Sequence, residues 1–447
     1  MADKIIAEHW LLPTGKEHAQ IKYQSSDTDY SPTLAHTQRL FIYKNHDKRA
    51  DFMPTEKLLD GLRKTIDQYP ILATRLVVLE NGDIEMHPSA EGVRYRESQC
   101  DKDIAAFNPS WPLSCIPPEW RATSWKAEKD MPVAIHVTRF ANNSGLVICL
   151  SGNHQIADGN GWSMLIQAWA AFTRGETPAP PVHDRQLLRL PEEHRHLLKR
   201  GGPELLQKLI VLLKHVERRH VLLRFRADKL AQLKADAVAS LTDEERASGW
   251  FSTLDATIVM LWRASVRART AVPDDKILAE TAALNMRHRL PDLPRNYFAN
   301  AVDAPRMTVT AGEMRRSTIG TLALKRRREA NNFQFASKEE WIIRASSGEF
   351  ASILNPNAYF DHGFDMACTD WSKFGYYTDT DFGYGNPVCC RYCSPPSNNL
   401  WVVFEGQPDG ASGSKPNGLD IALAIEDDAY ERFLADSDIV KYAEFLG

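Results

Sequence analysis

Residues 146–159 form the stretch that decides the fold: Leu146-Val147-Ile148-Cys149-Leu150-Ser151-Gly152-Asn153-His154-Gln155-Ile156-Ala157-Asp158-Gly159. Its first five residues are apolar, which is typical of a buried strand. Gly159 and Gly161 follow the acidic Asp158, and glycine permits backbone excursions that a bulkier residue would block. The stretch therefore predicts a strand, a tight turn and a helix, with His154 at the turn.

His154 has two interpretations at this point. Histidine is the only residue whose unperturbed side-chain pKa lets it accept and release a proton near neutral pH, so His154 is a candidate catalytic base. A histidine after a strand is also commonly a hydrogen-bonded core residue. The rest of the sequence has to decide between a catalytic and a structural histidine.

Length and composition describe an ordinary globular enzyme. The 447 residues exceed the usual size of a single hydrophobic core, so we expect two domains. The net charge of −4 gives no support for a nucleic-acid or anionic-membrane partner. The amino terminus is polar, without the apolar segment of a signal peptide, and no apolar run reaches the length of a membrane span. We expect a cytoplasmic monomer.

The seven cysteines are expected to be reduced thiols, because nothing indicates secretion. Cys389, Cys390 and Cys393 form a local cluster. A zinc site needs a fourth ligand and normally a second paired spacing, and neither is evident nearby. We therefore expect no metal.

The order of apolar patterns predicts an α/β fold in two halves. Residues 1–180 form the expected N-terminal domain, 181–219 an interdomain crossover with its own helical piece, and 220–447 the C-terminal domain. Asn81-Gly82 marks a hairpin turn between two short strands. The expected strands are 33–43, 73–79, 83–87, 133–140, 146–150, 277–284, 400–404 and 419–425, and the expected helices are 55–69, 161–174, 227–239, 252–270 and 427–434.

A second motif lies near the end of the chain, Thr380-Asp381-Phe382-Gly383-Tyr384-Gly385-Asn386-Pro387. Two glycines around an aromatic residue, with an Asp before them and a Pro after, predict a rigid loop. Asp-Phe-Gly also occurs in protein kinases, but no glycine-rich loop, strand lysine or His-Arg-Asp loop precedes it here.

Together the two motifs resemble those of one family, the BAHD acyltransferases. Residues 154–159 are similar to the family's H-x-x-x-D-G motif and 381–385 to its D-F-G-W-G motif, in the family's order and placement. Weaker similarities lie at 252–263, 285–290 and 293–300, so the resemblance covers essentially the whole chain. Tyr384 replaces the family's Trp, Asn285 its Asp and Ala299 its usual Gly.

The resemblance implies a fold of two chloramphenicol-acetyltransferase-like domains. Each would be a mixed β-sheet flanked by helices, with an active-site channel between the domains, and the fold allows a strand near residues 375–395 to join the first sheet. The implied activity is transfer of an acyl group from acyl-CoA, the co-substrate, to a hydroxyl or amine of a small specialised metabolite. No metal or tightly bound cofactor is implied.

The resemblance also assigns roles to single residues. His154 would take the proton of the acceptor in a direct transfer, since no Ser or Cys with a partnered base stands out in the motifs. Asp158 would pair with Arg287 and shape the turn, although a Ser-His-Asp-like orientation of the imidazole is the alternative.

Thr369 and Trp371 are the candidate oxyanion donors, with Trp371 as an ordinary packing residue the alternative. Gly159, Asp381, Gly383 and Gly385 would be structural.

Ser252, Thr253 and Asn300 are the candidate CoA-binding residues, because they fall in segments that match CoA-side regions of the family. The basic run 325–328 could also reach the CoA phosphates, but a solvated helix face is the preferred interpretation.

Two rival functions stay open. One is a non-catalytic small-molecule-binding protein of the same fold. The other is an amide or ester synthase like the peptide-synthetase condensation domains, which usually carry a second His where this chain has Asn153.

Overall fold

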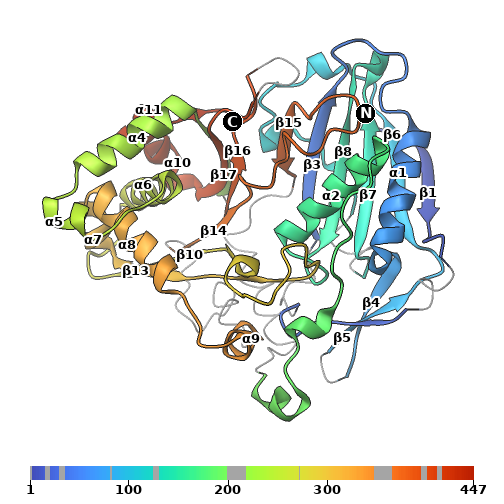
Figure 1. The fold of residues 1–447 in the computed structure, drawn as a ribbon. Coiled ribbons are helices and arrows are strands. Elements are labelled where there is room, and N and C mark those ends of the chain that lie inside the picture. The colour runs from blue at the N-terminus through green and yellow to red at the C-terminus, as the bar shows by residue number, and fades with distance from the viewer. Residues whose placement is uncertain are drawn as a thin grey trace.

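Two β-sheets, of six and seven strands, form the framework of the molecule in this computed structural model. The structure describes residues 3–15, 21–29, 36–80, 83–123, 130–198, 218–270, 272–346, 365–393, 400–409 and 415–447. The sheets lie on opposite sides of the molecule in Figure 1, the first mainly blue to green and the second mainly yellow to red. The sheets and their flanking helices confirm the expected α/β class.

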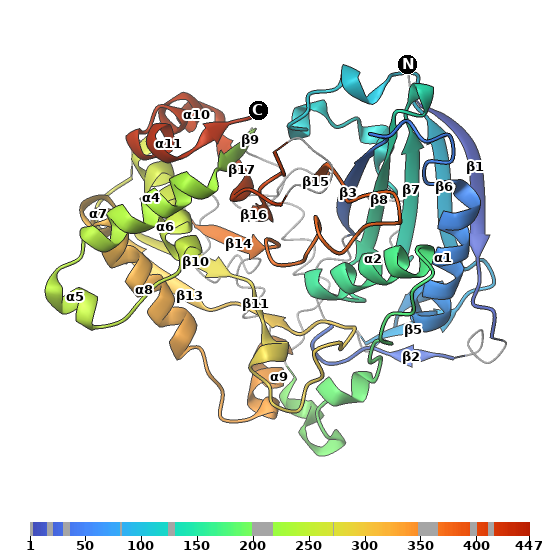
Figure 2. The same cartoon turned by 45° about the horizontal axis from the view of Figure 1, so that its top comes forward.

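The first sheet belongs mostly to the N-terminal part of the chain. Its strand order is β1 (Lys4–Leu11), β6 (Val93–Gln99), β7 (Val133–Arg139), β8 (Gly145–Asn153), β3 (His36–Lys44) and β15 (Cys389–Tyr392). Only β6 and β7 pair in parallel. Helices α1 (Thr55–Gln68) and α2 (Gly159–Thr173) lie side by side on one face, as Figure 2 shows.

Strand β8 is buried along its whole length because both faces of the sheet are covered. Leu146, Ile148 and Leu150 belong to the core under α1 and α2. Val147 and Cys149 belong to a smaller core on the opposite face, which includes Trp111, Trp120 and Phe140. The uninterrupted apolar run 146–150 is thus explained by a central strand that packs on both faces of the sheet.

The second sheet is mixed. Its order is β13 (Arg306–Thr310), β10 (Ile277–Ala282), β14 (Met366–Asp370), β16 (Leu400–Glu405), β17 (Leu419–Glu426), β9 (Arg218–Phe225) and β18 (Glu444–Phe445). Strands β10, β14 and β16 run in parallel, and the other pairs are antiparallel. Helix α6 (Thr253–Ala268) is the central covering helix and packs against α4 (Ala227–Ala239), α8 (Ile319–Asn332) and α10 (Asp427–Leu434).

Strand β16 shows how the two halves meet. Its side chains alternate between faces, as in any strand. Trp401 and Val403 pack into the core under α6, whereas Val402 and Phe404 pack into the core of the first sheet. The inner face of the second sheet is therefore buried against the first half of the molecule.

The remaining elements are short. A three-stranded sheet contains β2 (Tyr23–Gln24), β5 (Ile84–Pro88) and β4 (Thr74–Val78), and β11 (Leu284–Asn285) pairs with β12 (Val302–Asp303). The short helices are α5 (Asp243–Ala247), α7 (Ala311–Arg316), α9 (Lys338–Ser346) and α11 (Ser437–Tyr442).

Strand β15 crosses from one half of the molecule to the other. It lies within the expected interval 375–395, follows the Asp381 loop, and pairs antiparallel with β3, with Cys389 opposite Ile42 and Tyr392 opposite Arg39. The first sheet is therefore completed by a strand from the C-terminal part of the chain.

Several expected elements agree closely with the structure. Helices α4 and α10 have the expected bounds, and β4 and β5 pair as a hairpin. The turn residues Asn81 and Gly82, residues 33–35 of the first expected strand, and residues 199–217 of the expected crossover lie outside the described residues. The expected boundary at 220 falls inside β9, which begins at Arg218. Helix α6 begins at Thr253, because Ser252 caps it.

All seven cysteines are free thiols, and Cys115 alone among them is not buried. Within the described ranges, no group of three or more His, Cys, Asp or Glu side chains could hold a metal ion. No helix in the same ranges combines the length and the apolar character that a membrane crossing requires.

Candidate active site

His154 lies in the turn between β8 and α2, as the sequence predicts. Its side chain is half-buried, and its Nδ1 atom is buried without a hydrogen-bond partner among the described residues. Burial lowers the pKa of the imidazole below 6.5; the negative charge of Asp158 opposes this shift, and the positive charge of Arg39 adds to it. The ring is therefore neutral near pH 7, the form that accepts a proton.

Asp158 is bound by four donors and is not bonded to the imidazole. Its Oδ1 accepts hydrogen bonds from the Gly161 backbone N–H at 2.9 Å and from Arg287 Nη2 at 3.2 Å. Its Oδ2 accepts from Arg287 Nη1 at 2.7 Å and from the Ala301 backbone N–H at 2.9 Å. Burial would raise the pKa of Asp158, but Arg287 and these amides bring it below its ordinary value. The geometry favours the ion pair over the triad-like alternative.

Arg287 extends this connection. It is almost fully buried, and its remaining N–H groups donate to the carbonyl oxygens of Tyr297 at 3.0 Å and Ala299 at 2.7 Å. The turn that carries His154 is thereby fastened to residues 285–301, more than 120 positions later in the chain. The Asp158–Arg287 ion pair implied by the resemblance is present.

Asn300 lies against the His154 turn. Its Nδ2 donates to the His154 carbonyl oxygen at 2.8 Å and to Asp29 Oδ1 at 3.0 Å. Asn300 was expected on the CoA side; in the structure its amide nitrogen binds the backbone of the His154 turn and the Asp29 carboxylate. Its motif position does not reveal this contact, which depends on packing across the fold.

Thr369 and Trp371 lie at the end of β14 and reach the same turn from the second sheet. Trp371 Nε1 donates to Thr369 Oγ1 at 3.0 Å. A Cβ atom built on Gly159 would lie 3.0 Å from the Phe374 ring and 3.5 Å from Trp371 Nε1, so glycine makes room for Phe374 at the start of α2, and Trp371 lies in ordinary contact distance beside it. The indole N–H is engaged by Thr369, so the hydroxyl proton of Thr369 is the one left to donate.

Arg39 is a site residue that no motif predicts. Its guanidinium lies 4.4 Å from the centroid of the Trp371 ring, and its Nε donates to the Tyr376 hydroxyl at 3.0 Å. The only sequence signal is a charged residue directly before the apolar run Leu40-Phe41-Ile42-Tyr43.

Ser252 and Thr253 lie at the start of α6, on the outer side of the second sheet. Ser252 Oγ accepts from the Asp255 backbone N–H at 3.1 Å, and Asp255 in turn accepts from the Ser252 backbone N–H. Arg327 Nη2 also donates to Ser252 Oγ, at 3.0 Å. The structure places both residues at a capped helix N-terminus beside a cation.

The basic run 325–328 is not the uniformly solvated helix face that was preferred from the sequence. Arg326 is buried and donates to Asp255 at 2.6 Å and to Glu280 at 2.8 Å. Lys325 pairs with Glu313, and Arg327 pairs with Asp255. Arg326 is buried because it pairs with two carboxylates of the second half of the molecule, and the local sequence pattern does not reveal these pairs.

The Asp381 carboxylate closes its own loop with backbone hydrogen bonds. Asp381 Oδ1 accepts from the backbone N–H groups of Gly383 at 2.7 Å, Tyr384 at 2.9 Å and Gly385 at 2.9 Å. Gly383 and Gly385 have φ angles of 93° and 97°, in the left-handed region that favours glycine. The loop encloses one oxygen with three amides, as its composition predicts for a rigid turn.

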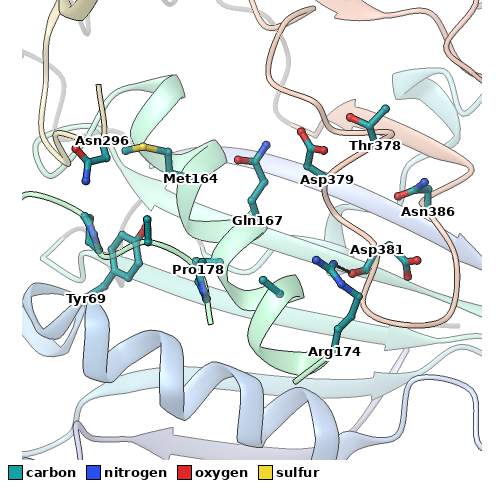
Figure 3. A pocket seen from close by; sticks show the side chains of 14 residues that line it. Tyr69, Met164, Gln167, Arg174, Pro178, Asn296, Thr378, Asp379, Asp381 and Asn386 are labelled. Carbon is teal, nitrogen blue, oxygen red and sulfur yellow. Dashed lines mark hydrogen bonds between the residues drawn. The ribbon is translucent and has the colours of Figure 1, made fainter. Parts of the chain in front are cut away.

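A pocket of about 520 Å³ lies between α2 and the segment that leads into this loop (Figure 3). Met164, Gln167 and Arg174 line it from the helix, and Asp379 and Asp381 line it from the loop. Arg174 also donates to the Asp381 carbonyl oxygen. His154 is not among the lining residues of this pocket.

Comparison with known proteins identifies the family. A model of the Transferase family matches residues 6–433. The chain is 23% identical over 394 residues to a taxadien-5-alpha-ol O-acetyltransferase of Taxus chinensis, covering 83% of this chain and 81% of that protein. It is 22% identical over 418 residues to a spermidine coumaroyl-CoA acyltransferase of Arabidopsis thaliana, covering 91% and 88%.

The fold is shared with F. sporotrichioides TRI101, whose crystal structure is complexed with coenzyme A and T-2. The TM-score is 0.73 at 17% identity, and the match covers 96% of this chain and 100% of that one. Because the family model spans nearly the whole chain, the protein belongs to the Transferase family, that of the BAHD acyltransferases.

Proposed function

We propose that the protein transfers an acyl group from an acyl-CoA thioester to a hydroxyl or amine of a small molecule, with His154 as general base. The observation that carries this proposal is the separation of His154 from Asp158. Both oxygens of Asp158 are occupied by Arg287 and backbone amides, so that His154 has no carboxylate partner among the described residues, and burial keeps its imidazole neutral. Such an imidazole can take a proton and return it.

The reaction then needs no covalent intermediate on the protein. The acceptor oxygen or nitrogen attacks the thioester carbonyl while the buried position of Nδ1 leaves Nε2 of His154 to take the acceptor proton. The Thr369 hydroxyl donates to the oxygen of the tetrahedral intermediate, oriented by its hydrogen bond with Trp371. The C–S bond breaks, and His154 returns the proton to the leaving CoA thiolate.

Acyl-CoA as the donor is supported by two comparisons. The Arabidopsis relative is named as a coumaroyl-CoA acyltransferase, and the TRI101 crystal structure contains coenzyme A. In this chain, Ser252 and Thr253 at the start of α6, together with Arg327, offer hydroxyls, helix N–H groups and a cation to the CoA phosphates. Asn300 is proposed to position the His154 turn instead.

The acceptor is proposed to be an alcohol or an amine, because the relatives include an O-acetyltransferase and a spermidine acyltransferase. We further propose two domains, 1–180 and 218–447, so that the second begins with β9, and the reaction takes place between the two.

The test is release of free CoA thiol from acetyl-, butyryl- and coumaroyl-CoA in the presence of a panel of alcohols and amines. His154→Ala should reduce kcat/KM by roughly 10²–10⁴-fold, since it removes general-base catalysis. His87→Ala is the matched control: His87 is half-buried on β5, beside Glu85, and is no part of the site, so activity should be retained. Release no faster than in His154→Ala, with every donor and acceptor, would favour the non-catalytic binding protein.

A further inference from the structure

Arg39 is a buried cation in the middle of the site. Arg39 lies on β3 and is only 2% exposed. Nε donates to the Tyr376 hydroxyl at 3.0 Å, and Nη1 donates to the Thr37 hydroxyl at 3.0 Å and the Thr37 carbonyl at 3.4 Å. All three acceptors are neutral groups. The guanidinium therefore has hydrogen bonds but no counter-charge from them.

Other buried arginines of the same protein show what is missing. Arg287 pairs with Asp158, Arg326 with Asp255 and Glu280, and Arg224 with Asp420. Arg185 pairs with Asp29, and Arg391 with Asp420. Arg39 is buried to a similar degree, yet within the described part of the chain it forms no ion pair with a carboxylate.

Among the described residues, neither Tyr376 nor Glu405 forms an ion pair with Arg39. Burial raises the pKa of Tyr376 to about 12, although Arg39 opposes the shift, so this phenol stays neutral. Glu405 interacts electrostatically with the same tyrosine, but burial raises the pKa of Glu405, and it forms no ion pair with Arg39. Because buried charges are normally paired, the lack of a partner calls for an explanation.

Three observations connect Arg39 with the proposed reacting groups. Its guanidinium stacks on Trp371, whose indole N–H bonds Thr369. Trp371 Nε1 would lie 3.5 Å from a Cβ atom at Gly159, which places the indole beside the turn after His154. The positive charge of Arg39 also helps to lower the pKa of His154. The cation thus lies against Trp371, the hydrogen-bond partner of Thr369, and its charge is felt at His154.

We propose that Arg39 binds a carboxylate carried by one of the two substrates, so that the enzyme selects an acidic acyl chain or an acidic acceptor. This inference rests on the proposed acyl transfer and deepens it. A guanidinium presents paired N–H groups that match the two oxygens of a carboxylate, and the Nη2 group has no protein acceptor in the described ranges. Stacking on Trp371 and the bond to Tyr376 hold the fork in place before the substrate arrives.

The donor arm of the test compares malonyl-CoA and succinyl-CoA with butyryl-CoA, using whichever acceptor of the panel releases most CoA. The acceptor arm compares 3-(4-hydroxyphenyl)propanoate and γ-aminobutyrate with their methyl esters, using the best neutral donor. The measured quantity is the ratio of kcat/KM for the acid to kcat/KM for its neutral counterpart. A high ratio in one arm identifies which substrate carries the carboxylate.

Arg39→Gln removes the charge but keeps a polar group for Tyr376 and Thr37. It should lower the ratio in the preferred arm by about 30-fold or more, the effect of truncating one partner of a buried charged pair. Arg39→Lys should retain part of the preference, because it keeps the charge and loses the fork. Arg219→Met, at an exposed arginine on β9, is the control and should keep the wild-type ratio.

Two results would overturn the inference. Wild-type protein that releases CoA equally well from acids and neutral counterparts in both arms would leave the acyl transfer standing and remove the role of Arg39. A loss of activity in Arg39→Gln that is equal for acids and neutral compounds would make Arg39 a structural support of Trp371. Absence of any CoA release by the wild-type protein would instead overturn the proposed function, and the inference with it.

Discussion

Asp158 and Asp381 each begin a glycine-containing turn, yet the two turns are held in opposite ways. Asp158 is buried and receives donors from its own helix and from residues 287 and 301 in the other half of the molecule. The Asp381 carboxylate is partly exposed and, in the described part of the chain, accepts hydrogen bonds from backbone N–H groups of the next few residues. The two turns thus have different structural roles. Asp158 joins distant segments around His154, whereas the Asp381 carboxylate stabilises its own loop.

Removing Asp158 should therefore have the largest effect on stability. Asp158→Ala leaves the buried Arg287 without its counter-charge and should lower the free energy of unfolding by about 3–5 kcal/mol. Chemical denaturation of the purified variant measures this. Arg287→Met should lose a comparable amount, and the double variant less than the sum, because the two residues are in contact. Normal stability with lost turnover in Asp158→Ala would instead assign Asp158 to the reaction.

Removing Asp381 should have a smaller effect. Asp381→Ala takes one acceptor from three amides that are partly open to water, so we expect a loss of about 1–2 kcal/mol in the same denaturation experiment. Asp379→Ala, at an exposed neighbour, is the control and should change stability by less than about 0.5 kcal/mol. If Asp381→Ala lost as much free energy of unfolding as Asp158→Ala, the proposed difference between the two turns would be wrong.

Substitution of a glycine in the Asp381 loop tests whether the conformation of the loop affects stability without affecting the reaction. Gly385→Ala forces a Cβ atom into a left-handed conformation, at φ 97°, and should lower stability by about 1 kcal/mol. The melting temperature should fall while kcat/KM at low temperature changes little, because the loop does not line the site around His154. A selective loss of kcat/KM would show that the loop reaches the reaction.

The pH dependence of kcat/KM distinguishes Asp158 from Asp381 by their effects on the pKa of His154. Burial lowers the pKa of His154, so kcat/KM should stay level as pH falls through 6.5 and decline only at lower pH. Asp158 opposes that shift, so Asp158→Asn should move the acid limb of the kcat/KM profile still lower, whereas Asp381→Asn should leave it in place. The same sign holds for stability: below pH 6.5 the unfolded chain takes up a proton on His154 before the folded chain does, which favours unfolding. An unmoved acid limb in Asp158→Asn would contradict this electrostatic coupling.

Local patterns predicted much of this molecule. The strand, turn and helix around His154 and the helices α4 and α10 follow from apolar periodicity and turn residues. Strands β1 and β6 escaped prediction because charged residues interrupt them, as Arg94, Arg96 and Glu97 do in β6. The apolar pattern records burial, and these strands carry ion pairs among their side chains.

The site was predictable only where a motif existed. His154, Asp158 and Arg287 came from motifs and their resemblance to a family. Arg39 and the contact of Asn300 with the His154 turn depend on which distant segments meet, and neither has a spacing that local patterns report. The cation beside Trp371 emerges only when β3 and β14 are seen together.

The pairing of β15 with β3 has a consequence for synthesis on the ribosome. Without residues 389–392, β3 would be an open edge of the first sheet, with its backbone groups free to pair with another chain. Nearly nine-tenths of the protein must be translated before the native partner exists. We therefore expect nascent chains truncated before residue 389 to aggregate or to recruit chaperones, even though most of the first sheet has already been made.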